Sequence, residues 1–304
     1  MKPSAIIDAH CHLWQLNNEI NGWLDNPNNA FLGDISAIQQ DYLLKDYQKD
    51  SADFPVEKIV HIEAANSAHA IKEIQWLAEQ YDDNDYLYAV VGGASLTEKN
   101  IEAQLDYYHH SKKVSGVRDI LNWHETPAYR SCDRQDYMTD RQWQRNFALL
   151  AKYQLSFDMQ IVSSQLAQAY QLAKTYDEVS IIIDHAAFPL PDGIAHWQQS
   201  MKKIAQCDNV VVKLSGFGPL SRKIDKQTVR DQVLYLIEQF GVNRCMFASN
   251  FPVEKLYIAY NDLFNFFNTI VQDFNNTEKQ ALFYDTALRV YQKLGPEPVE
   301  SSRS

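Results

Sequence analysis

Two histidines separated by one residue end the first strand-like run of the chain, in Asp8-Ala9-His10-Cys11-His12. Residues i and i+2 of a strand point to the same side, so both imidazoles would face one end of the strand together. Zinc and similar ions favour imidazole nitrogen ligands. We therefore predict that His10 and His12 are metal ligands.

A third histidine ends another apolar run, Ile181-Ile182-Ile183-Asp184-His185. The apolar residues indicate a buried strand, and the ionisable pair at its end is typical of a functional site. We predict that His185 is a further metal ligand and a catalytic residue. A hydrogen-bonded structural histidine is the alternative.

Two other charged residues end strand-like runs. Glu63 follows Lys58-Ile59-Val60-His61-Ile62, where its carboxylate would serve as a metal ligand or a catalytic base beside the histidines. Arg118 ends Val114-Ser115-Gly116-Val117, where its planar guanidinium suits a substrate carboxylate or carbonyl oxygen. The alternatives are a surface position for Glu63 and an ion pair of Arg118 with a neighbouring aspartate such as Asp119.

Eight runs of strand length and composition must position these residues. They are 5–10, 58–63, 86–91, 114–118, 155–160, 180–185, 210–215 and 244–250. Amphipathic helical patterns stand in most of the gaps, for example Trp197, Met201 and Ile204. Alternating strands and helices predict a single-domain (β/α)8 TIM barrel over residues 1–294. An open doubly wound sheet is the alternative, although no glycine-rich phosphate loop follows the first run.

Two long segments interrupt the alternation, at residues 14–57 and 120–140. Loops that follow barrel strands lie on the face where barrel enzymes bind substrate. We expect both segments to form pocket walls, with ordinary surface loops as the alternative.

The bulk composition narrows the possible partners. A net charge of −11 argues against nucleic acid and anionic membrane as general partners, and no apolar run is long enough to span a bilayer. Four scattered cysteines and the absence of a signal peptide pattern predict a cytoplasmic protein with a small-molecule substrate. The Pro/Glu/Ser-rich residues 295–304 are expected to be a disordered tail.

Several spaced motifs in one order resemble the amidohydrolase-related family of TIM-barrel metal-dependent hydrolases. The resemblance covers about residues 6–294, and its motifs are Ile7–Trp14, Val60–Ala64, Gly116–Arg118, Ile183–His185, Lys213–Gly216 and Arg244–Val253. The His-x-His-x-Trp opening is similar to the branch containing sugar and aromatic-acid lactonases. We accordingly place Trp14 with Arg118 among the substrate-binding residues.

One position departs from that family's pattern. The resemblance implies an aspartate as general base in a Ser-Asp-x-Pro sequence, but this chain has Asn250 there. A carboxamide is neutral and does not accept a proton at physiological pH, although its oxygen can ligate an ion or orient water. Asn250 therefore stays a candidate catalytic residue with an altered role, and the identity of the base is open.

The resemblance implies a hydrolase that opens the lactone of a small sugar acid or aromatic-derived carboxylic acid. A divalent metal, zinc first, is the expected cofactor, and a metal-free site is the alternative because Asn250 removes one negative charge. A decarboxylase on the same scaffold and a non-catalytic binding protein are the competing functions, since one barrel supports many chemistries.

Overall fold

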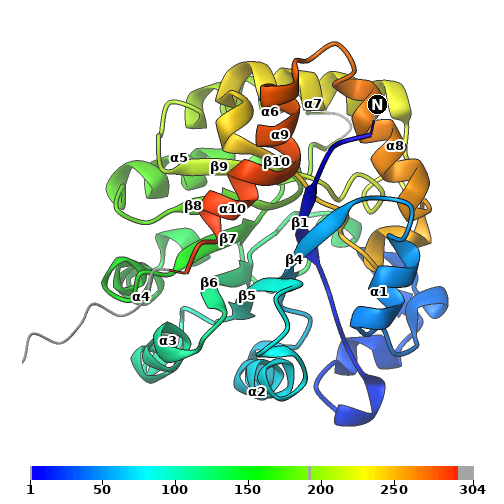
Figure 1. Cartoon of the computed structure of the whole chain (residues 1–304). Coiled ribbons are helices and arrows are strands. Elements are labelled where there is room, and N and C mark those ends of the chain that lie inside the picture. Colours follow the sequence, from blue (N-terminus) through cyan, green and yellow to red (C-terminus); the bar gives the residue numbers. More distant parts are fainter. Residues whose placement is uncertain (1, 191–192, 294–304) are drawn as a thin grey trace, which may run out of the picture.

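The centre of the computed structural model, which describes residues 2–190 and 193–293, is one parallel sheet of eight strands (Figure 1). The strands follow one another in chain order around the sheet. They are β1 Ile6–Cys11, β4 Val56–Ile62, β5 Leu87–Gly93, β6 Val114–Ile120, β7 Ser156–Gln160, β8 Ile181–Ile183, β9 Val210–Leu214 and β10 Cys245–Phe247. These are the eight strands predicted from sequence.

The sheet closes between its first and last strands. Cys11 forms a parallel bridge with Phe251, and the amide of His12 donates to the Phe251 carbonyl at 2.8 Å. The amide of Asn250 donates to the His10 carbonyl, also at 2.8 Å. The expected TIM barrel is confirmed, and the open doubly wound sheet is excluded by these bonds.

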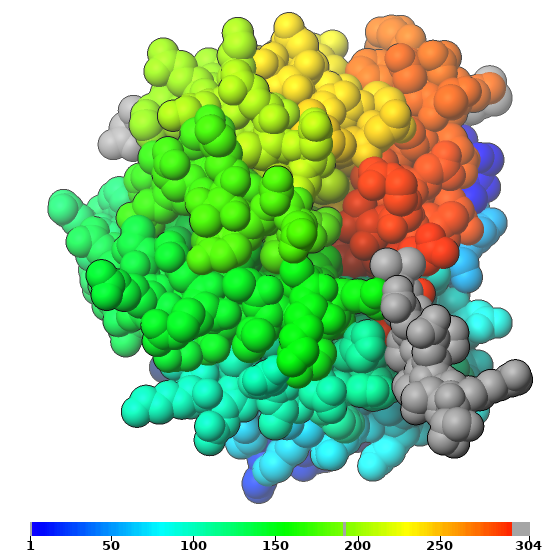
Figure 2. All heavy atoms as spheres, turned by 90° about the vertical axis from the view of Figure 1, so that its left-hand side faces the viewer, coloured from blue at the N-terminus to red at the C-terminus, as the bar shows by residue number. Residues whose placement is uncertain are grey.

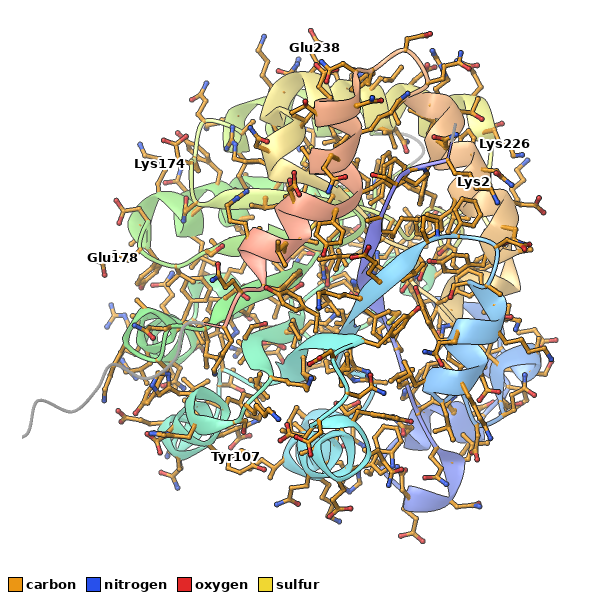
Figure 3. All side chains as sticks on the ribbon, in the orientation of Figure 1. Lys2, Tyr107, Lys174, Glu178, Lys226 and Glu238 are labelled. Atoms are coloured by element: carbon orange, nitrogen blue, oxygen red, sulfur yellow. The ribbon has the colours of Figure 1, made fainter. Side chains whose placement is uncertain are left out.

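Helices surround the barrel because each has one apolar face to bury. In α6, for example, Trp197, Met201 and Ile204 are buried as their spacing predicts. Figure 3 shows charged side chains such as Lys174 and Glu238 on the outer side of the helical layer. The helices are α1 Leu44–Asp50, α2 Ala70–Tyr81, α3 Ile101–His110, α4 Arg141–Lys152, α5 Leu166–Thr175, α6 Ile194–Ile204, α7 Lys226–Phe240, α8 Tyr260–Ile270, α9 Asn276–Gln280 and α10 Thr286–Val290.

The C-terminal segment covers one end of the barrel. In Figure 2 the colours run around the molecule in chain order, and the red C-terminal segment lies inside that ring. Ala287 and Tyr291 pack against the strand residues Ile7, Val60 and Met246 in one buried cluster. The functional site must therefore lie at the opposite, C-terminal end of the strands.

The two long segments predicted from sequence lie after β1 and β6 at that opposite end. Residues 14–57 hold the short hairpin of β2 Asn28–Asn29 and β3 Gly33–Asp34, followed by α1. Residues 120–140 run from the end of β6 to α4 and contain two short 3-10 turns. In the part of the chain that the structure describes, we find no helix long and apolar enough to cross a bilayer. The tail predicted at residues 295–304 lies outside the described residues.

Candidate active site

A cavity of about 370 Å³ opens at the C-terminal ends of the strands. Its polar floor gathers six side chains from different strands and loops: His12, Glu63, Arg118, Gln160, His185 and Asn250. Its walls are mostly apolar and include Trp23, Phe31 and Leu32 from the first long segment and Ile120 from the second. Both long segments thus contribute to the pocket, as their position after barrel strands predicts.

The three histidines singled out from sequence lie together beside this cavity. The ring centroids of His10 and His12 are 5.0 Å apart, and those of His10 and His185 are 4.5 Å apart. All three are buried, although His10 does not line the cavity itself. The barrel therefore joins positions that are about half the chain apart in sequence.

His12 presents an unprotonated nitrogen to the cavity. Its Nδ1 lies 2.8 Å from the carbonyl oxygen of Ile62, which only accepts, so Nδ1 carries the ring proton. Burial and the neighbouring Arg118 hold the pKa of His12 well below its usual range, and the ring is neutral. Its Nε2 lone pair then faces Oδ1 of Asn250 at 3.3 Å. Two neighbouring acceptors can share one donor from the cavity, such as a water molecule that lies to one side and contacts both.

The carboxamide of Asn250 is fixed by Glu254, a residue that the sequence interpretation did not single out. Asn250 Nδ2 donates to Glu254 Oε2 at 3.2 Å, which leaves Oδ1 to face His12. Burial raises the pKa of Glu254 to about 7. The only signal in the sequence was a carboxylate four residues beyond the altered position.

His185 lies just beyond β8, on backbone in the left-handed region (φ 54°). Its Nδ1 lies 2.9 Å from Ser215 Oγ, and burial lowers its pKa to about 3. Gly216 is required beside it, because a Cβ at that position would lie 2.4 Å from the His185 ring and the local φ is +65°. The Leu214-Ser215-Gly216 sequence thus orients the His185 ring.

Arg118 contacts the side chains of Asp184, Glu63 and Gln160, and it donates hydrogen bonds to Gln160 Oε1 and to the Glu63 carbonyl oxygen. Its Nε lies 3.2 Å from Asp184 Oδ2, its Nη1 lies 3.5 Å from Glu63 Oε1, and its Nη2 donates to Gln160 Oε1. Asp119 instead accepts from Trp143 on the other side of the strand, at 3.0 Å. Arg118 lies at the cavity as predicted, and it also pairs with an aspartate, which is Asp184 and not Asp119.

Glu63 follows β4 and is 7% exposed, not a surface residue. Burial raises its pKa well above the usual range, even though Arg118 acts to lower it. The Glu63 carboxyl group therefore holds its proton more tightly than an exposed glutamate does.

Three buried residues, His10, Asp184 and His185, each offer a ligand atom within 4.8 Å of the others. His10 Nδ1 lies between Lys213 Nζ at 3.1 Å and Asp184 Oδ1 at 3.4 Å, while its buried Nε2 has no hydrogen-bond partner. Lys213 Nζ donates to Nδ1 in this arrangement; an Nδ1 proton turned to Asp184 instead would leave Nε2 free to bind an ion. The three residues therefore fit a divalent metal ion, in competition with the Lys213 contact. Asp184 was not foreseen as a ligand, although it directly precedes His185.

Buried charges below this group are balanced within the protein. Lys213, 0% exposed, contacts Asp158 and lies 3.0 Å from Asp184, and Tyr291 donates to Asp158 at 2.7 Å. Burial raises the pKa of Asp184, but Lys213, His10 and Arg118 outweigh that effect and hold it well below the usual range. A divalent ion bound here would therefore contact an aspartate that already pairs with two cationic side chains, Lys213 and Arg118.

Trp14 does not line the cavity, contrary to the substrate-binding position expected for it. It is fully buried and donates from Nε1 to the Gln40 carbonyl at 2.8 Å. Trp23 packs edge-on against it, with ring centroids 5.6 Å apart, and lines the cavity in its place. The backbone pairing of Trp14 with Tyr42 turns the Trp14 ring into the core of the long segment.

Comparison with known proteins agrees with this architecture. The family model described as Amidohydrolase matches residues 7–293. An uncharacterized protein, y4mH, of Sinorhizobium fredii is 32% identical over 96% of this chain and 99% of its own length. An L-fucono-1,5-lactonase of Burkholderia ambifaria is 24% identical over 84% of this chain and 83% of its own length.

Among solved structures, an amidohydrolase from Burkholderia multivorans with bound zinc shares the fold with a TM-score of 0.81. It is 21% identical, over 95% of this chain and 99% of that chain. The family match covers nearly the whole barrel, including every strand that carries a site residue. The chain is therefore a member of the amidohydrolase family, as its motifs predict.

Proposed function

We propose that this protein hydrolyses a lactone of a small sugar acid or aromatic-derived carboxylic acid. The observation that carries the proposal is the convergence of two acceptors, His12 Nε2 and Asn250 Oδ1, inside a cavity that Arg118 and Glu63 also line. A water molecule held by both acceptors would lie beside a cationic group and a proton donor. Ester hydrolysis requires these three functions together.

His12 is the general base of this mechanism. As the water oxygen attacks the lactone carbonyl carbon, a water proton passes to the free Nε2 of His12, while Asn250 Oδ1 accepts from the other O–H. The Nδ1 donor to Ile62 keeps Nε2 unprotonated before the step, and it stabilises the imidazolium that forms after it. Asn250 thus orients the water without itself accepting a proton.

Arg118 and Glu63 act on the substrate. A guanidinium held by Asp184, Glu63 and Gln160 would stabilise the negative charge that develops on the carbonyl oxygen. When the ring C–O bond breaks, the protonated Glu63 carboxyl group gives its proton to the leaving alkoxide. The product is the open hydroxy acid, and the His12 proton restores Glu63 by way of water.

A divalent ion, zinc in the first instance, would be held by His10, His185 and Asp184, with His12 and Asn250 close by. When bound, it supplies additional positive charge to polarise the lactone carbonyl. The solved relative with bound zinc supports this choice of metal. His12, Arg118 and Glu63 keep the roles given above in either state.

The cavity walls restrict the class of substrate. Among the lining residues that the structure describes, Arg118 is the only lysine or arginine, whereas Trp23, Phe31, Leu32 and Phe188 present apolar surface. A lactone with at most one carboxylate and one apolar face fits this lining better than a dicarboxylate does. The L-fucono-1,5-lactonase relatives support a sugar-acid lactone in particular.

A panel of lactones tests the proposal. Purified protein, with and without added zinc, is mixed with sugar-acid lactones and aromatic-acid lactones, and acid release is followed with a pH indicator. We expect turnover of an uncharged sugar-acid lactone that His12→Gln abolishes. Carbon dioxide release from aromatic acids without lactone opening would identify a decarboxylase, and ligand binding without any turnover would identify a binding protein.

A further inference from the structure

Glu254 is a buried acidic side chain that forms no ion pair with any residue in the described ranges, 2–190 and 193–293. It lies in the 3-10 turn Val253–Leu256, is 1% exposed, and accepts hydrogen bonds from the Gly218 amide at 2.7 Å and from Asn250 Nδ2 at 3.2 Å. Burial raises its pKa, and the hydrogen bonds from Asn250 and from the backbone of Gly218 and Phe217 lower it. Burying a carboxylate against neutral donors alone is costly, so its presence calls for an explanation.

We propose that Glu254 is a positioning residue that orients the side-chain amide of Asn250. The two residues form one functional unit, with the carboxylate at position 254 and the carboxamide at position 250. The inference rests on the proposed function, because Asn250 acts there by presenting Oδ1 to the attacking water. Glu254 does not line the cavity and acts only through Asn250.

The geometry decides which way the amide points. An ionised Glu254 can only accept hydrogen bonds, so the amide must turn Nδ2 toward it and Oδ1 toward His12. The reversed amide would place Oδ1 against the carboxylate and give His12 Nε2 a hydrogen bond from Nδ2. The base would then be blocked, and the water would lose one of its two acceptors.

Replacing Glu254 by glutamine should cause that reversal. The Gly218 amide is a fixed donor, so the glutamine must present its oxygen there and its Nε2 toward Asn250. Two amide NH₂ groups would then face each other, and only rotation of the Asn250 amide relieves the contact. Glu254→Gln keeps the size of the side chain and changes only which atoms donate.

The exchange of both residues should restore the pattern. In Asn250→Asp/Glu254→Gln, the new carboxylate accepts from the glutamine Nε2 and still turns one oxygen toward His12. Asn250→Asp alone should do worse than the exchange, because it places two carboxylates about 3.2 Å apart, and such pairs must share a proton.

The experiment compares these three variants with the native protein at pH 8 on the best lactone of the panel, and it measures kcat, KM and melting temperature. We expect Glu254→Gln to lower kcat at least tenfold with KM changed less than threefold. The double variant should recover at least half of that loss on a logarithmic scale. Glu238→Gln on α7, an exposed substitution of the same type, is the matched control and should leave kcat unchanged.

An unchanged kcat in Glu254→Gln, or a double variant no better than that single variant, would overturn the proposal. If the native protein opens no lactone, that result rejects only the proposed function. The melting temperatures then still test whether Glu254 and Asn250 are paired. Both single variants should then melt several degrees below the double variant. Additive melting shifts in the double variant would count against the pairing itself.

Discussion

Nε2 of His12 and Oδ1 of Asn250 face each other at 3.3 Å, although both atoms accept hydrogen bonds. Ile62 fixes the proton of His12 on the opposite nitrogen, and Glu254 fixes the amide of Asn250. Neither side chain can turn a donor toward the other without losing its own partner. The pair is therefore prepared to bind a donor from the cavity, and the first prediction follows from it.

Removal of the base nitrogen should reduce turnover strongly. His12→Gln keeps a polar side chain of similar length but lacks an imidazole that can take the water proton. We expect kcat to fall by about 10²–10⁴-fold, the usual contribution of a positioned general base, in steady-state assays on a lactone substrate. His110→Gln, an exposed change on α3, should leave kcat unaltered. An equal kcat for His12→Gln and the native protein would show that another residue is the general base.

Arg118 should contribute through the shape of its guanidinium as well as its charge. Arg118→Lys keeps the charge but cannot contact Asp184, Glu63 and Gln160 together. We expect kcat/KM to fall by an amount equivalent to a loss of about 1–3 kcal/mol in transition-state stabilisation, the size of one charge-assisted hydrogen bond. Unchanged kinetics in this variant would show that Arg118 has a structural role in the barrel and no role in catalysis.

Metal affinity should depend on position 250. Asn250→Asp adds an anionic oxygen beside three neutral imidazoles, so zinc affinity, measured by equilibrium dialysis, should rise about tenfold or more, equivalent to roughly 1.4 kcal/mol. His185→Gln removes one member of the ligand group and should lower it. Identical zinc affinities in the native protein and both variants would show that an ion, if it binds at all, binds away from this group.

Asp119 should make stability depend on pH. Burial raises its pKa to about 7, so the folded protein binds this proton more tightly than the unfolded chain does. Its contribution to stability is therefore present at low pH and is lost as the pH rises from about 4 to about 7. Asp119→Asn removes that loss while an oxygen remains available to accept from Trp143.

The gain in the free energy of unfolding from Asp119→Asn should be larger at pH 8 than at pH 5, by roughly 2 kcal/mol after allowance for partial exposure of the group. Urea denaturation at the two pH values measures it. The exposed Asp177→Asn is the control and should give the same change at both values. A pH-independent gain from Asp119→Asn would mean that the carboxyl group is ionised throughout.

The sequence by itself determined the barrel and the location of the site. Short β-branched runs alternating with amphipathic stripes allow few arrangements other than parallel strands with crossover helices. Because the C-terminal ends of such strands meet on one face, His12, Glu63, Arg118, His185 and Asn250 could be assigned to one pocket from their places at strand ends.

Tertiary structure alone decided which atoms of those residues face one another. Trp14 and Trp23 belong to the same long segment, and only the backbone pairing of Trp14 with Tyr42 shows which ring reaches the cavity. The tautomer of His12 and the orientation of Asn250 depend on Ile62 and Glu254. Ile62 is 50 residues from His12, and Glu254, although only four residues from Asn250, lies in a turn whose side-chain directions no periodicity records, so these orientations are known only once the barrel has closed.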